Sequence, residues 1–252
     1  MVTPRIQRID AVVLKANSFR ETSLIGSLLS RQQGRIGFIS RGARRPGTSA
    51  AAALQPTNLV SCSVYLGSGA GLRTVTGVET ARVHEMIARV PVLLGLASYG
   101  CELVMAQLPE EDPAPGIYAL LKGYLSALNE ASAEEAERAR LAFDFRMQQS
   151  LGYALRIDAC ARCGATITTA STFSLEHGGL MCPACMNQDA CHEALVAGDL
   201  DVLRAMLTEP FSRWRRRPVS HETIARLARI ARGMWDHHSP ARVRSKSLSF
   251  LA

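Results

Sequence analysis

Short runs in which hydrophobic and polar residues alternate fill the first part of the chain. Alternation with a period of two, in runs rich in Val, Ile and Leu, predicts β-strands that bury one face. Gln33-Gly34 is placed to close a hairpin. The predicted strands cover residues 9–16, 22–31, 35–40, 54–66 and 72–79. Five short strands with glycine-rich connections fit a small closed barrel such as an OB-fold. A fragment of a β-sandwich is the alternative, although a sandwich normally has more strands.

Near residue 80 the hydrophobic period changes to that of helices. Apolar residues then recur at spacings of three and four along residues 93–104, 117–128 and 138–151. Prolines between the first two segments separate them, and Gly152 follows the third. This part of the chain therefore predicts three amphipathic helices.

Two more helices are predicted at residues 195–207 and 224–235. Ser220 is a suitable N-cap for the last of them, with Glu222 in its first turn. The expected protein is α+β: an N-terminal OB-fold β-barrel at 1–80, then an α-helical domain at 81–252.

Four cysteines form two Cys-x-x-Cys pairs, which are Cys160, Cys163, Cys182 and Cys185. The spacing is typical of a tetrahedral zinc site, in which each pair forms a tight turn with converging thiolates. Four thiolates leave no open coordination position, so one structural Zn²⁺ per chain is expected, in a module at about 158–187 inserted in the helical domain. Two disulfides or two redox dithiols are the alternatives. The nearby pair Cys191-His192 is a less favoured source of a ligand.

The net charge of +7 is unevenly distributed. Residues 1–80 hold ten basic and three acidic residues, residues 81–210 hold nine and seventeen, and residues 211–252 hold ten and two. Two basic ends around an acidic middle favour a polyanionic partner, most simply nucleic acid. A compositional bias toward Arg would explain Arg in place of Lys, but it would not explain this segregation.

Basic residues of the predicted barrel are the candidates for DNA binding, namely Lys15, Arg20, Arg31, Arg35, Arg41, Arg44 and Arg45. Aromatic residues for base stacking are few there: Phe19, Phe38 and Tyr65. We therefore expect contacts dominated by phosphate, with strong salt dependence and no sequence preference. The alternative is an ordinary solvated charge run on a loop.

No motif for catalysis accompanies these features. The sequence contains no phosphate-binding loop, nucleophile elbow, paired-histidine metal motif or dinucleotide-binding glycine pattern, so the protein is not expected to be an enzyme. Its most apolar stretch, residues 90–106, is short for a membrane span and contains Glu102. The N-terminus lacks an apolar signal core, so a cytoplasmic protein is expected.

Taken together, the residues resemble one family, the bacterial recombination mediator RecO. The resemblance rests on short motifs in the same order and spacing over nearly the full chain. They are Ser18-Phe19-Arg20-Glu21-Thr22-Ser23, Gly34-Arg35-Ile36, Arg41-Gly42-Ala43-Arg44-Arg45, Leu54-Gln55-Pro56, residues 143–152, the cysteine pairs, Phe173-Ser174-Leu175-Glu176 and Gly178-Gly179-Leu180. The final stretch, from Ser239-Pro240 onward, matches only loosely. Some relatives lack the metal cysteines, which implies that zinc supports structure there.

The resemblance implies a protein that binds single- and double-stranded DNA and anneals complementary strands. It also implies RecR as a partner, contact with the C-terminal tail of single-strand-binding protein, and an indirect role in loading RecA. Two other classes of protein stay open from the residues alone. A nuclease or ligase accessory domain would need clustered carboxylates for Mg²⁺, and an interaction scaffold would bind partners through the acidic middle without DNA affinity.

Overall fold

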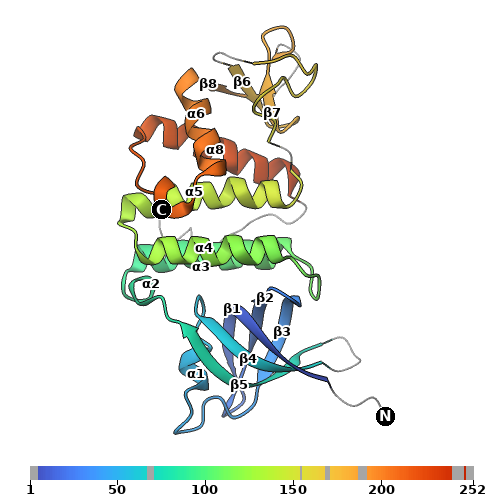
Figure 1. The fold of residues 1–252 in the computed structure, drawn as a ribbon, viewed down its shortest axis with the longest axis vertical. Coiled ribbons are helices and arrows are strands. Elements are labelled where there is room, and N and C mark those ends of the chain that lie inside the picture. Colours follow the sequence, from blue (N-terminus) through green and yellow to red (C-terminus); the bar gives the residue numbers. More distant parts are fainter. Residues whose placement is uncertain are drawn as a thin grey trace. The chain divides into compact units, whose positions relative to one another are not determined.

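The computed structural model describes residues 5–66, 71–153, 155–167, 171–186, 192–239 and 247. The chain forms two compact units (Figure 1). The first, here called the barrel unit, is Met1–Glu130 with Ser245–Ala252, and the second, the helical unit, is Ala131–Arg244. This division places the boundary later than residue 80, because helices that follow the strands pack with the barrel. No helix in the described part of the chain has the length and apolar character needed to span a membrane.

Five strands curve around a common interior in the barrel unit (Figure 1). They are β1 (Arg5–Phe19), β2 (Ser23–Ser30), β3 (Gly34–Ser40), β4 (Leu59–Leu66) and β5 (Arg73–Arg82). The barrel is closed in the order β1-β2-β3-β5-β4. Neighbours pair antiparallel except β3 and β5, which pair parallel. The predicted α+β fold with a five-stranded OB-type barrel is confirmed.

The barrel interior is filled by side chains that alternate along the strands. In β3 every second residue is buried, including Ile36 and Phe38. Phe38 is therefore a core residue, and its prediction as a base-stacking aromatic is wrong. Gly26 lies where β1 approaches β2 most closely, because a Cβ there would meet the Lys15 carbonyl oxygen at 1.9 Å. A side chain at this position would force the two strands apart.

One predicted strand begins too early. Residues 54–58 do not belong to β4, because they form the short connection between α1 (Ala50–Ala53) and the start of β4 at Leu59. That connection is fixed to β1, since the Thr57 amide donates to the Val13 carbonyl and the Val13 amide to the Asn58 carbonyl. Thr57 has a φ of 71°, which lies in the left-handed region and is incompatible with a strand.

Three helices complete the described part of the barrel unit: α2 (Glu85–Arg89), α3 (Pro91–Gln107) and α4 (Pro115–Asn129). The two longer ones match the predicted helices and extend them to a proline at the first turn. α3 and α4 approach closely at Gly100, where a Cβ would lie 2.7 Å from a ring carbon of Tyr124. The Tyr124 hydroxyl donates to the Leu96 carbonyl at 2.9 Å, which fixes the register of the two helices.

The connection between α3 and α4 adds to the edge of the barrel. The Glu111 amide donates to the Arg35 carbonyl at 2.8 Å. In return, the Arg35 guanidinium donates to the Leu108 carbonyl and pairs with Glu110. Gly34 has a φ of 67° and a Cβ there would meet the Asp112 backbone, so the close approach needs glycine.

The helical unit contains α5 (Ala133–Ser150), α6 (Ala197–Thr208), α7 (Phe211–Trp214) and α8 (His221–His238). α5 starts five residues before the predicted helix, at a capping box in which Ser132 and Glu135 bond each other's backbone amides. This Ser-x-x-Glu signal is visible in the sequence and was missed. The predicted cap of α8 is confirmed, since the Ser220 side chain accepts from the Thr223 amide.

A small sheet lies beside the cysteine turns in the same unit. Its strands are β6 (Ser171–Ser174), β7 (Gly179–Met181) and β8 (His192–Leu195), in the order β7-β6-β8. Phe173 and Leu180 are buried beneath it.

Candidate metal centre and nucleic-acid interface

The first cysteine pair lies in a tight turn that packs on β7. The Gly164 amide donates to the Cys160 carbonyl at 2.9 Å, and Gly164 has a φ of 75°. The Ala161 amide donates to the Leu180 carbonyl at 2.7 Å, which attaches the turn to the strand. The chain leaves the turn at residue 164 in a left-handed backbone conformation. Glycine is favoured there because it adopts this conformation without steric cost.

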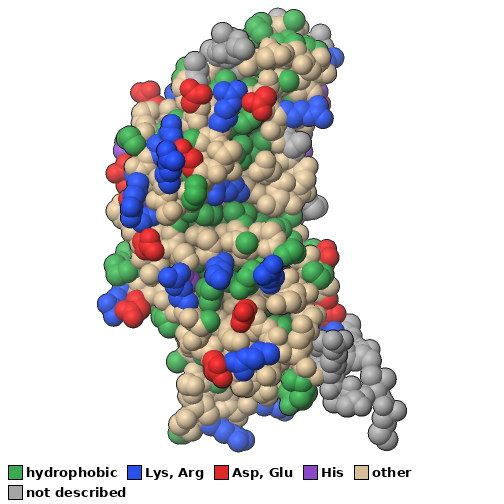
Figure 2. Space-filling model, in the orientation of Figure 1, with side chains coloured by type: hydrophobic (Ala, Val, Ile, Leu, Met, Phe, Trp, Pro, Cys, Tyr) green, Lys and Arg blue, Asp and Glu red, His purple; other side chains and the backbone are tan. Residues whose placement is uncertain are grey.

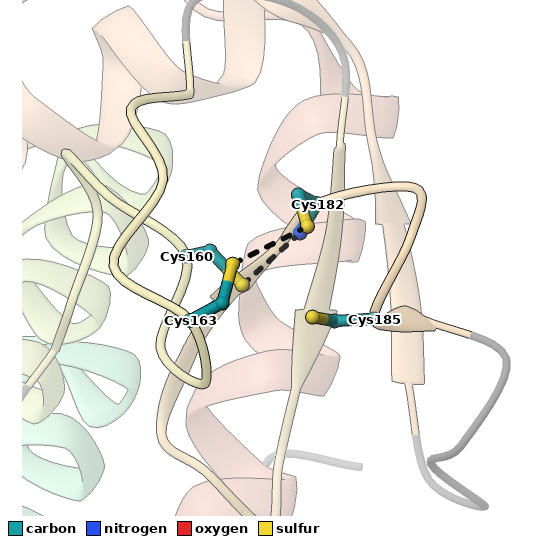
Figure 3. Close-up of side chains that lie close together, drawn as sticks. All are labelled: Cys160, Cys163, Cys182 and Cys185. Carbon is teal, nitrogen blue, oxygen red and sulfur yellow. Dashed lines mark hydrogen bonds between the residues drawn. The ribbon is translucent and has the colours of Figure 1, made fainter.

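The second pair follows β7 directly and forms a matching turn. The Cys185 amide donates to the Cys182 carbonyl at 2.9 Å, and the Cys182 amide donates to the Cys160 sulfur at 3.4 Å. The sulfur atoms of Cys160, Cys163, Cys182 and Cys185 are turned toward one point (Figure 3) and lie within 4.8 Å of one another. The structure therefore brings all four predicted ligands together.

The sulfur spacing fits a metal site and excludes a disulfide in this arrangement. The Cys163 and Cys182 sulfur atoms are 3.7 Å apart, well beyond a disulfide bond of about 2.05 Å. A tetrahedral Zn²⁺ with Zn–S bonds of about 2.3 Å has sulfur–sulfur edges of about 3.8 Å. The Cys163–Cys182 separation matches that edge length. The alternative ligand Cys191 lies outside the described residues.

The site also favours a cation electrostatically. Burial raises the pKa of the Cys160 thiol, but the backbone N–H groups of Cys163, Cys182 and Arg162 lower it, and the resulting pKa is about 6. Hydrogen bonding with the Cys182 thiol raises the pKa of Cys185 to about 12. Four thiols this close cannot all ionise without a counter-charge, and a divalent cation supplies it. The cluster can hold a metal ion with no open position for a substrate.

Four of the predicted DNA-binding arginines gather at one end of the barrel. Arg20 lies in the turn between β1 and β2, while Arg41, Arg44 and Arg45 lie in the connection after β3. The two segments are bonded together, since the Arg44 amide donates to the Thr22 carbonyl at 2.9 Å and its guanidinium to the Glu21 carbonyl. This brings cations from two separate sequence motifs onto one surface.

A hollow of about 620 Å³ opens between these segments. It is lined by Phe19, Arg20, Glu21, Thr22, Ser23, Ile39, Arg41, Gly42 and Arg45. Within the described part of the chain, no carboxylate lies within ion-pair distance of its three arginines. The hollow therefore presents three guanidinium groups that have no ion-pair partner among the described residues.

The other predicted residues lie elsewhere. Arg31 follows β2 and Arg35 begins β3, roughly 20 Å along that strand from Arg41. The Arg35 guanidinium already bonds Leu108 and Glu110, so it serves packing of the α3–α4 connection. Lys15 is exposed on β1, at a bulge between Val13 and Lys15. The seven candidates thus form one cluster of four and three separate positions.

Several of the described basic residues after residue 210 form ion pairs within the helical unit. Arg215 is buried and pairs with Glu135, and Arg226 makes two bonds to buried Asp199. A second hollow of about 420 Å³ is lined by Glu209, Arg213, Arg216, Arg217 and Pro218. On the face drawn in Figure 2, Lys and Arg side chains lie at several separate places with acidic ones among them. Residues 240–246 lie outside the described residues.

Comparison with known proteins decides the family. Residues 5–84 match the family described as Recombination protein O N terminal, and residues 90–247 match Recombination protein O C terminal. The chain belongs to the RecO family. The expected resemblance is confirmed over both units.

Curated relatives in the RecO family match over nearly their whole length. The "DNA repair protein RecO" of Syntrophotalea carbinolica is 30% identical over 245 residues, which is 96% of this chain and 93% of the relative. Proteins of the same name from Pelotomaculum thermopropionicum and Symbiobacterium thermophilum are 29% and 28% identical, over 98% and 96% of this chain and 94% and 95% of theirs. The protein is a DNA repair and recombination protein of this family.

Proposed function

We propose that this protein is a non-enzymatic recombination mediator that binds single- and double-stranded DNA and anneals complementary strands. The observation that carries the proposal is the cluster of Arg20, Arg41, Arg44 and Arg45 at one end of an OB-type barrel. OB barrels bind nucleic acid strands across one face and the adjoining loops. The family's role in DNA repair supports DNA as the polyanion.

The proposed mechanism is charge neutralisation. Guanidinium groups at the barrel end contact phosphates of a bound strand, which lowers the repulsion when a second strand approaches. Base pairing then drives the reaction, because each duplex step is worth about 1.4 kcal/mol. No covalent chemistry is required of the protein. Lys15 and Arg31 are proposed as phosphate contacts separate from this cluster, and Arg35 contributes to folding of the barrel edge.

The four cysteines hold one structural Zn²⁺ in this proposal. The metal would supply the positive charge that keeps four thiolates together, and the chain's own turns supply the geometry. With β6, β7 and β8 around it, the centre stabilises the helical unit and takes no part in DNA contact.

Membership of the RecO family supports the choice of protein partners. We propose that the protein acts with RecR, contacts the acidic C-terminal tail of single-strand-binding protein, and thereby assists RecA loading indirectly. Such a mediator would work in the cytoplasm at the nucleoid. The acidic, apolar-ended tail suits a groove with a neighbouring arginine.

The salt dependence of DNA binding tests the proposal. Replacing Arg44 and Arg45 with Ala should weaken binding to an oligonucleotide and reduce the slope of log affinity against log salt by about one unit per lost contact. Arg89→Ala is the matched control, because Arg89 is an exposed arginine on α2 that pairs with Glu85. An unchanged slope in the double variant would remove these residues from the interface. Absence of DNA binding by the unaltered protein would favour an interaction scaffold.

A further inference from the structure

The hollow at the barrel end is lined by an aromatic residue as well as by arginines. Phe19, the last residue of β1, is 37% exposed on its rim, although an exposed phenyl ring loses the benefit of burial. The Arg20 guanidinium lies 5.3 Å from the centre of the Phe19 ring. An exposed aromatic beside arginines is the arrangement that proteins use to stack an unpaired base and hold its phosphate.

The backbone at this point is held in an uncommon conformation. Arg20 has a φ of 53°, in the left-handed region that residues with a side chain rarely adopt. Arg20 thus occupies a position where glycine would be less strained. The turn places Phe19 and Arg20 together on the rim of the hollow. Strain of this kind is concentrated at binding sites.

The outer face of the barrel continues from the hollow toward a second exposed aromatic. The strand register places Ile39 opposite Thr74, and Thr74 opposite Tyr65 on β4. Tyr65 is 36% exposed, and Ile39 lines the hollow. Because neighbouring strands lie about 4.8 Å apart, Tyr65 is roughly 10 Å from Ile39. Phe19 and Ile39 therefore line the hollow together, and Tyr65 lies two strands beyond Ile39 on the outward side of the barrel.

We infer that this face is a subsite for unpaired nucleotides, with Phe19 stacking one base in the hollow and Tyr65 stacking another. The inference rests on the proposed DNA-binding function and adds strand selectivity to it. In a duplex the bases are stacked and paired inside, so they cannot reach Phe19, whereas the phosphates still reach Arg41 and Arg45. The hollow has the volume of a small-ligand pocket, about 300–1,000 Å³. One acidic residue, Glu21, lines it against three arginines.

Equilibrium binding of the full chain to a labelled single-stranded oligonucleotide and to the matching duplex tests the inference. Phe19→Leu keeps an apolar side chain without a ring, and should weaken single-strand binding by about 5- to 100-fold. Duplex binding should change less than about twofold, because phosphate contacts are retained. Tyr65→Leu should act in the same direction, and Phe19→Tyr should keep the selectivity of the original protein.

Two controls make the outcomes distinct. Leu94→Ala removes a similarly exposed apolar side chain on α3 and should affect neither substrate. Arg41→Gln with Arg45→Gln should weaken binding to both substrates. Equal loss of single-strand and duplex binding in Phe19→Leu, or no loss of either, would overturn the inference while leaving the proposed function intact. No binding of either substrate by the unaltered protein would overturn both.

Discussion

At the scale of single residues, Asp199 shows how the helical unit tolerates a buried charge. Its carboxylate accepts hydrogen bonds from the Val196 amide, the Thr223 hydroxyl and two nitrogens of Arg226. Burial raises the pKa of Asp199, but the hydrogen bonds from Arg226, Val196 and Thr223 lower it, so the net pKa lies below its ordinary value. The folded protein therefore favours the ionised form of the Asp199 carboxyl group.

Replacement of Asp199 by Asn should destabilise the protein by about 1–3 kcal/mol at about pH 7, because a buried amide cannot accept all the hydrogen bonds that the carboxylate accepts from Val196, Thr223 and Arg226. A lowered folded-state pKa contributes stability above the unfolded value of about 3.9, and that stability is lost as the pH falls through the folded pKa. The difference between the two proteins should therefore shrink in acid. Denaturant unfolding at about pH 7 and at an acidic pH measures the difference in the free energy of unfolding. Asp201→Asn, at an exposed carboxylate on the same helix, is the control and should change little. An unchanged difference in acid would contradict this role.

Gly100 makes a second prediction at this scale. A Cβ at Gly100 would meet Tyr124 of α4, so Gly100→Ala should cost about 1–3 kcal/mol by overpacking, reduced by about 1 kcal/mol of gained helix propensity. Gly116→Ala adds the same methyl group in open space in the first turn of α4 and should be neutral or stabilising. Thermal unfolding of the two variants compares them. Equal effects would show that the α3–α4 approach is not tight.

At the scale of elements, the cysteine turns and the sheet β7-β6-β8 form one module whose strands are short. Strands of this length contain few residues, so the module would depend on the proposed metal for its stability. Cys160→Ser should lose bound zinc and increase amide exchange in β6 and β7, while the barrel strands keep their protection. Metal analysis with hydrogen exchange measures both. Cys101→Ser is the control, since Cys101 is a buried thiol on α3 outside the cluster. Stoichiometric zinc in Cys160→Ser would contradict the four-ligand site.

The elements also show what the sequence can predict. The cysteine spacing, the strand alternation and the stripes of α3 and α4 are local signals, and each located its element. The start of β4 was predicted too early because the backbones of Thr57 and Asn58 bond Val13, a contact distant in sequence. The start of α5 needed only the Ser132 and Glu135 pattern.

The sequence predicted which types of residue form the candidate interface, but it predicted the positions of only some of them. The cations were visible in the sequence, but the pairing of Arg35 with Glu110, 75 residues away, depends on the fold. Phe38 and Phe19 could not be told apart by composition, and the strand pleat buries one and exposes the other. Selection among the arginines therefore required three-dimensional contacts.

At the scale of the whole molecule, the proposed function combines DNA binding by the barrel with a helical unit that the proposed metal stabilises, and it requires no covalent chemistry. If charge neutralisation drives pairing, the rate of annealing should depend on the barrel arginines and on salt, and should need no nucleotide cofactor. The metal centre should affect annealing only through folding of its own unit.

The most direct test is annealing of complementary fluorescent oligonucleotides that carry single-strand-binding protein, followed without nucleotide. The account predicts that the protein accelerates annealing and that Arg41→Gln with Arg45→Gln slows it, while Arg89→Ala does not. If the folded, metal-replete protein produces no acceleration, the central claim is contradicted and the chain is a scaffold or a partner-dependent subunit.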